Sequence, residues 1–231
     1  MDNLYRKGYD EMRLEFDNPS YIKDIQKYSQ DLLGLELTEQ GKKYCVLRSV
    51  ASLKIEEYDS MLNRMFLLVL EMGEDIIEAI KKKSLDELSN VTILDKTVNK
   101  LFNACLRIIN RSGFPRNIYF SGKLIVRLED AGDRYKDLAE YLVSLKEFKI
   151  SKNTLDFLED VNKQFRKTYE LYNNFDKEKI LYIFEKREEL LKNINKLLDK
   201  VNKKEIRIIH ILGKSIDDIY EASSPIFGLN L

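Results

Sequence analysis

The sequence has little of what the commonest catalytic and metal-binding sites require. Its 231 residues include one histidine and two cysteines. With a single histidine, no spacing supports a Ser-His-Asp triad, and the Glu-x-x-His motif of ferritin-like di-iron proteins is missing. Cys45 and Cys105 lie far apart in the chain without a metal-type pairing. We therefore expect both cysteines to be reduced core residues.

Long apolar segments and an excess of one charge are also missing. The longest uninterrupted apolar run, Met65–Leu70, is far too short to span a membrane. The first residues contain no apolar segment suited to a signal peptide, so we expect a cytoplasmic protein without membrane insertion. Lys+Arg and Asp+Glu both number 39, which excludes a whole-chain basic field for nucleic acid. We therefore expect no nucleic-acid partner.

The first part of the chain, residues 1–52, predicts a small β-α-β-β segment. Its apolar residues first alternate with polar ones, then follow a helical stripe, and then alternate again. A segment of this size buries little by itself, so we expect it to lean on the rest of the chain. The predicted elements are a strand at 9–16, a helix from Asn18-Pro19 to Gly34, and strands at 35–39 and 43–48 joined through Gln40-Gly41.

From Ile55 onward the apolar period changes to 3.6 residues and predicts six helices. Short connections favour antiparallel neighbours. We therefore expect a mostly α protein in which residues 53–231 form two three-helix bundles, one at 53–149 and one at 150–231. The predicted helices end at Lys83, before Ser112-Gly113, at Lys149, before Asn173, after Leu197, and at Ala222, where Ser223-Ser224-Pro225 stops the last one.

Within the third predicted helix, residues 127–142 combine an apolar stripe with a carboxylate face. Glu129, Asp133 and Glu140 fall within an arc of about 40°, because 4 and 11 residues return nearly to the same angle. Asp137 lies beside them. A helix that packs by one side and presents carboxylates on another can hold cations. The apolar stripe consists of Leu124, Leu128, Ala131, Tyr135, Leu138 and Leu142.

The carboxylate face has a plain alternative interpretation. It is then a solvated acidic surface in which the carboxylates pair with Arg127 or Lys136 at helical spacing. The same holds for His210, which lies on the polar side of its own helical stripe and can be an exposed surface residue. The residues alone leave both alternatives open.

An internal repeat relates the third and sixth predicted helices. Residues 129–140 align with residues 210–221 at a constant offset, which places one glycine at the same point of each helix. The aligned pairs are Gly132 with Gly213, Asp137 with Asp218, Leu138 with Ile219, and Glu140 with Glu221.

With this repeat the chain resembles PhoU-type proteins, phosphate-uptake regulators built as two repeated three-helix bundles. Their third-helix signature is a Glu-x-x-Gly/Ala-Asp-x-x-x-Asn-Ile-Ala-Glu-like run, which residues 129–140 fit at most positions. Residues 27–46 and 62–68 resemble archaeal-type members, in which a β-α-β-β segment precedes the bundles. Such relatives often begin with an AbrB-like DNA-binding domain, and this sequence has no residues left over to form one.

The resemblance implies a metal site in the first repeat. In the family, carboxylates of a Glu/Asp-x-x-x-Asp motif on the third and sixth helices bind metal clusters, commonly of iron or zinc. Carried over by position, Glu129 and Asp133 are the candidate ligands, with Asp137 in support. An all-oxygen set suits a hard divalent cation, and the motif lies away from the apolar stripe.

The second repeat departs from the family pattern. His210, Lys214 and Asp218 occupy the corresponding positions. An imidazole can bind a metal, but an ammonium cannot and repels a nearby cation. We therefore expect a degraded second site, and at most one metal site in the chain.

The resemblance also implies a function. We expect a non-enzymatic cytoplasmic regulator or adaptor of phosphate uptake or phosphate signalling, which docks as a homodimer on a transporter's ATPase subunit or a signalling protein. The alternative is a dimerisation or ligand-sensing module of a transcription regulator whose DNA-binding part is absent from this chain. An enzyme, such as a di-metal hydrolase or oxidase, lacks the histidines and paired motifs that it would need.

Overall fold

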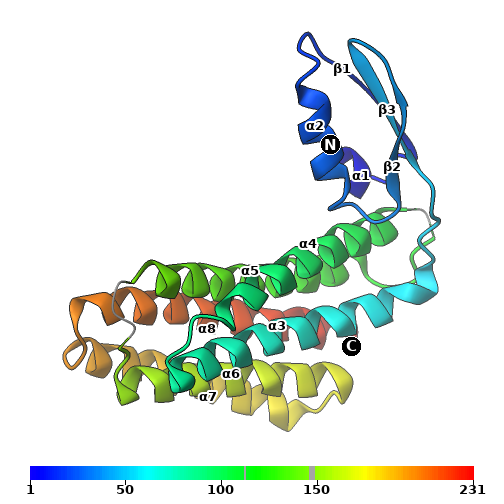
Figure 1. Ribbon diagram of the computed structural model, residues 1–231. Coiled ribbons are helices and arrows are strands. Elements are labelled where there is room, and N and C mark those ends of the chain that lie inside the picture. The colour runs from blue at the N-terminus through cyan, green and yellow to red at the C-terminus, as the bar shows by residue number, and fades with distance from the viewer. Residues whose placement is uncertain (112, 146–148) are drawn as a thin grey trace.

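The computed structural model describes residues 1–111, 113–145 and 149–231, and it has two parts (Figure 1). A small α/β unit stands on one end of an array of long helices, so the molecule is L-shaped. The α/β unit contains α1 (Asp2–Arg6), β1 (Glu11–Glu15), α2 (Tyr21–Ser29), β2 (Leu35–Gln40) and β3 (Tyr44–Ser49). The array contains α3 (Tyr58–Lys82), α4 (Leu88–Asn110), α5 (Ile118–Ser144), α6 (Lys152–Asn173), α7 (Lys177–Leu198) and α8 (Lys203–Leu229).

The three strands form an antiparallel sheet in the order β1-β3-β2. Met12 of β1 lies opposite Leu47 of the central strand, and both side chains are buried. They belong to a small core with Tyr5, Leu32 and Leu35. The predicted β-α-β-β order is therefore confirmed, although the first strand is shorter than the predicted 9–16.

The sequence analysis missed α1. This helix is a single turn, too short to show an apolar period. Its buried Tyr5 donates a hydrogen bond to the main-chain oxygen of Leu33 (2.7 Å), which ties the turn to the connection between α2 and β2. Tertiary contacts, rather than local sequence, therefore hold α1 in place.

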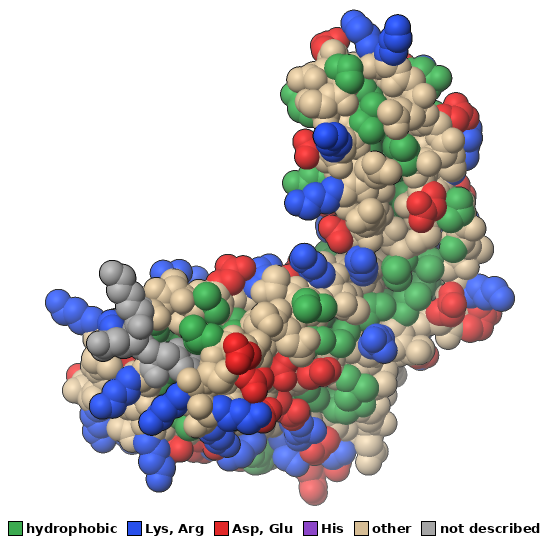
Figure 2. Space-filling model, in the orientation of Figure 1, with side chains coloured by type: hydrophobic (Ala, Val, Ile, Leu, Met, Phe, Trp, Pro, Cys, Tyr) green, Lys and Arg blue, Asp and Glu red, His purple; other side chains and the backbone are tan. Residues whose placement is uncertain are grey.

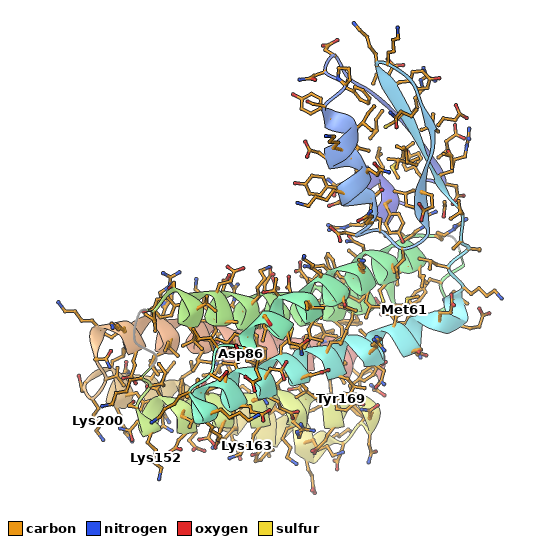
Figure 3. All side chains as sticks on the ribbon, viewed as in Figure 1. Met61, Asp86, Lys152, Lys163, Tyr169 and Lys200 are labelled. Atoms are coloured by element: carbon orange, nitrogen blue, oxygen red, sulfur yellow. The ribbon has the colours of Figure 1, made fainter. Side chains whose placement is uncertain are left out.

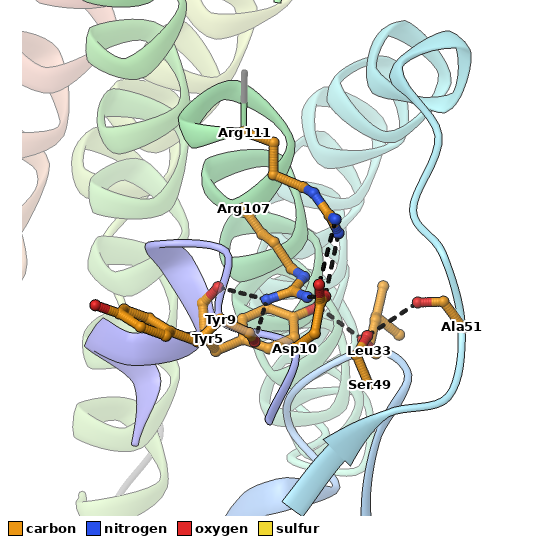
Figure 4. Close-up of polar contacts among 8 residues, drawn as sticks. All are labelled: Tyr5, Tyr9, Asp10, Leu33, Ser49, Ala51, Arg107 and Arg111. Atoms are coloured by element: carbon orange, nitrogen blue, oxygen red, sulfur yellow. Dashed lines mark hydrogen bonds and ion pairs between the residues drawn. The ribbon is translucent and has the colours of Figure 1, made fainter. Parts of the chain in front are cut away.

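The α/β unit is joined to the helical array by Arg107, which projects from the last turns of α4 (Figure 4). Its guanidinium donates to the main-chain oxygens of Tyr5 (2.9 Å) and Tyr9 (2.8 Å) and pairs with Asp10. Arg107 is 1% exposed. Because a guanidinium withdrawn from water must have its donors satisfied, these bonds fix where the α/β unit sits on α4.

The helical array confirms the expected mostly α fold with six long helices. α5 packs on α3 and α4, α8 packs on α6 and α7, and α5 and α8 pack on each other. The whole apolar stripe predicted for the third helix, from Leu124 to Leu142, is buried. Tyr169 of α6, labelled in Figure 3, donates a hydrogen bond to Asn63 of α3 (2.9 Å). The boundaries predicted at 52/53 and 149/150 stay predictions.

Two predicted helix ends are wrong. α5 ends at Ser144, not at Lys149, because Leu145 turns into an extended conformation and packs against the core. Residues 146–148 of that predicted helix, and Ser112 of the preceding break, lie outside the described residues. α8 continues through Pro225 to Leu229 instead of ending at Ala222. A proline inside a helix costs about 3 kcal/mol, and the burial of Ala222 and Ile226 outweighs that cost here.

Among the described residues, none of the helices combines the length and apolarity that crossing a bilayer requires.

Replacing Arg107 should weaken the whole attachment of the α/β unit. We expect Arg107→Ala to lower the free energy of unfolding by about 2–4 kcal/mol, because two main-chain carbonyl oxygens and Asp10 lose the donors of a buried guanidinium. Urea denaturation followed by circular dichroism measures the change. The matched control is Arg111→Ala, which removes a more exposed guanidinium 3.3 Å from the same Asp10 and should cost less than about 1 kcal/mol. Equal losses in the two variants would contradict this role of Arg107.

Candidate functional site

The predicted ligand Asp133 is engaged by a cation of its own helix. Lys136 Nζ lies 2.7 Å from Asp133 Oδ1 and 3.3 Å from Asp95 Oδ2 of α4. Asp95 is buried, which raises the pKa of its carboxyl, and the charge of Lys136 opposes that shift. The pairing of these carboxylates with Lys136, which was the alternative interpretation of the acidic face, therefore neutralises part of its charge.

Glu129, one turn before Asp133, is half-buried where α5 faces α4 and α1. Burial raises the pKa of Glu129 to about 7, and the negative charges of Asp133 and Asp130 add to the rise. Arg6 of α1 acts in the opposite direction. Near neutral pH this carboxyl is thus divided between its protonated and ionised forms, and a cation that binds here must displace the proton of the protonated form into solvent.

The third predicted ligand, Asp137, lies apart from this pair. It is exposed, and its nearest ion-pair partner is Arg134 at 3.8 Å. The same guanidinium donates from Nε to Asp218 of α8 (3.1 Å). Arg134 therefore connects Asp137 with Asp218, the two aspartates that the internal repeat aligns.

Asp218, which the sequence analysis places in the degraded second site, pairs with two arginines of α5. It is buried between α8 and α5, where Arg127 Nη1 lies 3.4 Å away in addition to Arg134. Arg127 also pairs with Glu221 (2.6 Å) and Asp130 (2.9 Å). These residues form an ion-pair network across the α5–α8 contact. No local pattern reveals the pairs between the two helices, because the arginines of α5 and the acids of α8 lie far apart in the chain.

The other two residues of the predicted second site, His210 and Lys214, lie together on an exposed face of α8. They border an apolar groove of about 380 Å³ between α7 and α8. Leu191, Ile194 and Leu198 of α7 line the groove from the other side. Asp218 lies on the buried side of the same helix, so the structure does not bring these three predicted positions together.

The described residues do not present a preformed metal site. Within 1–111, 113–145 and 149–231, no group of three or more His, Cys, Asp or Glu side chains is arranged to hold a metal ion. Of the predicted ligands, Glu129 and Asp133 share one face of α5, and Lys136 occupies the space beside Asp133. Asp95, which the sequence analysis missed, adds a buried carboxylate here. The sequence does contain a signal for Asp95, because this acidic residue directly follows Leu94 of the apolar stripe of α4.

The raised pKa of Glu129 has a measurable effect on stability. Between pH 4.5 and about 7, Glu129 is ionised in the unfolded chain but still largely protonated in the folded protein. The free energy of unfolding therefore falls as the pH rises through that range. We expect Glu129→Gln, which cannot ionise, to be more stable than the parent by about 1–2 kcal/mol at about pH 8. Near pH 4.5 the two proteins should unfold alike.

Denaturation at both pH values checks this expectation. The control is Glu140→Gln, an exposed carboxyl on the same helix, which should change stability by less than about 0.5 kcal/mol at either pH. A gain for Glu129→Gln that is the same at both pH values would show that titration of this group is not its cause.

Comparison with known proteins identifies the fold. No family model matches the chain, and no curated protein sequence matches it. The phosphate transport system regulatory protein PhoU from Streptococcus pneumoniae is similar in structure, with a TM-score of 0.60 and 17% identity over 76% of this chain and 94% of that one. PhoU from Pseudomonas aeruginosa has a TM-score of 0.61 and 18% identity over 76% of this chain and 96% of that one. This chain therefore has a PhoU-like fold over about three quarters of its length.

Proposed function

We propose that this protein is a non-catalytic cytoplasmic regulator of phosphate uptake or phosphate signalling. The observation that carries the proposal is the PhoU-like fold, which spans nearly the full length of two PhoU proteins, one of them a phosphate transport system regulatory protein. The repeat match between residues 129–140 and 210–221 supports it independently of the fold.

The regulator acts by docking through its surface. Acidic and basic side chains are interspersed over the visible face of the helical array (Figure 2), as suits a polar interface formed and released reversibly. The partner that fits the proposal is the ATPase subunit of a phosphate transporter or a phosphate-signalling protein, and the chain binds it as a homodimer.

Partner capture tests this function. The full chain, immobilised and incubated with cytosol from its source cells, should enrich a transporter ATPase subunit or a phosphate-signalling protein, identified by mass spectrometry. Cells lacking the gene should no longer adjust uptake of labelled phosphate to the external supply. Enrichment of a DNA-binding protein, together with unchanged phosphate uptake, would contradict the proposal and favour the transcription-regulator alternative.

A metal bound by Glu129 and Asp133 is part of the proposal. These two carboxylates, with Asp137 in support, would hold a hard divalent cation or an iron or zinc ion. Because the pKa of Glu129 is raised to about 7, binding at neutral pH must release a proton from part of the Glu129 population, so the affinity should rise with pH. Lys136 opposes binding, because it pairs with Asp133 at 2.7 Å.

Measurement of bound metal in the parent and in three variants tests this site. After incubation with iron or zinc and removal of free metal, elemental analysis should find metal in the parent and none in Glu129→Ala/Asp133→Ala. Lys136→Ala should bind at least as much as the parent, because it frees Asp133, and Glu140→Ala should match the parent. Metal content that is the same in the parent and the double variant would contradict the site.

A further inference from the structure

Helix α7 buries much less of itself than its counterpart in the other repeat. It packs against α6 and α8 and lies at the margin of the array farthest from the sheet (Figure 1). Only Ile183 and Leu190 of its residues are buried, whereas more than half of α4 is buried. α7 therefore has apolar surface that the described residues of the chain do not cover.

The apolar surface of α7 forms a second stripe with coiled-coil spacing. One stripe, through Ile183 and Leu190, faces the array. The second repeats at intervals of three and four residues, and its members Leu181 and Phe184 are 59% and 49% exposed. Such a regular three–four pattern is the seam of a two-helix coiled coil. Four positions of the second stripe are apolar, Leu181, Phe184, Leu191 and Leu198, and the exposed polar residues Glu188 and Asn195 occupy the other two.

The groove between α7 and α8 continues this seam. Its apolar walls are Leu191, Ile194 and Leu198 on α7, and Ile206 and Ile209 on α8. Ile206 is 42% exposed. Leu191 and Leu198 belong to both the seam and the groove, so a helix laid along α7 could also contact the apolar residues of α8.

The charges along the seam are complementary to themselves when one copy is reversed. Glu185 and Glu188 precede the middle of the helix, and Lys192 and Lys196 follow it. In an antiparallel pair with Leu181 against Leu198 of the partner subunit, Glu185 lies next to the partner's Lys192, and the reverse pair repeats the contact. A parallel pair would instead place Glu188 against the partner's Glu188, two like charges in the seam.

We propose that α7 pairs antiparallel with α7 of a second copy of this chain, with the two-fold axis near Glu189 and Leu190. Neighbouring cations do not compete for this contact, because Lys186 already pairs with Glu189 (2.7 Å) and Arg187 with Asp217 (2.8 Å). The inference specifies the homodimer named under the proposed function, and it rests on that part of it.

Sedimentation velocity over a range of protein concentrations tests the apolar seam. The parent should sediment as a dimer, and Leu181→Lys/Phe184→Lys should sediment as a monomer. Both residues are exposed, so the variant should keep its helical circular dichroism. Its melting temperature should fall modestly, because Phe184 packs edge-to-face on Tyr220 (5.8 Å) and the stabilisation by the dimer is lost. The matched control is Ile93→Lys on α4, which is 61% exposed and should stay dimeric.

Charge reversal tests the orientation. Glu185→Lys and Lys192→Glu should each weaken the dimer about tenfold or more, and the double variant should restore parental affinity. If both single variants dimerise more weakly and the double variant does not restore the affinity, the antiparallel arrangement is overturned. A dimer that survives Leu181→Lys/Phe184→Lys would overturn this interface and leave the homodimer standing. A parent protein that is monomeric would overturn both this interface and the homodimer. The role in phosphate regulation is decided separately by the uptake assay.

Discussion

The contact between α5 and α8 is the constraint on which the helical array depends, because it is where its two sets of three helices meet. Its apolar centre is fully buried, and its polar margin is the network of Asp218 with Arg127 and Arg134. A slip of one helix along the other would leave the buried Asp218 without its cations, a penalty of several kcal/mol. The network therefore fixes the register of the two helices, whereas the apolar contacts supply most of the stabilisation.

A second close approach ties the two repeats together through α3 and α6. Gly73 lies against the buried Asn162, whose side-chain oxygen accepts a hydrogen bond from Tyr135 of α5 (3.0 Å). A side chain at residue 73 would collide with that oxygen, so glycine is required there. The aromatic ring of Phe66 stacks on Phe165 beside this point. Three helices thus meet around one satisfied polar pair, which makes the α3–α6 contact specific as well as apolar.

The sequence predicted the elements better than their ends or their polar partners. Apolar periodicity is a property of each helix alone, so the stripe from Leu124 to Leu142 could be read directly. The stop at Pro225 was wrong because the packing of Ala222 and Ile226, which decides it, involves other helices. The arginine partners of Asp218 could not be predicted for the same reason, since Arg127 and Arg134 lie in the other repeat. Local patterns are visible in one sequence, and contacts between distant segments are not.

α4 and α7 occupy the same position in the two repeats, but their outer surfaces differ in what covers them. α4 receives α1 on its outer side, where the α/β unit satisfies the buried Arg107 with main-chain oxygens and Asp10. α7 receives no such unit from the described part of the chain, and it keeps an exposed apolar seam with self-complementary charges. An edge helix in water needs cover for a surface of that kind. The α/β unit supplies that cover at α4, and a second copy of the chain can supply it at α7 without any further protein.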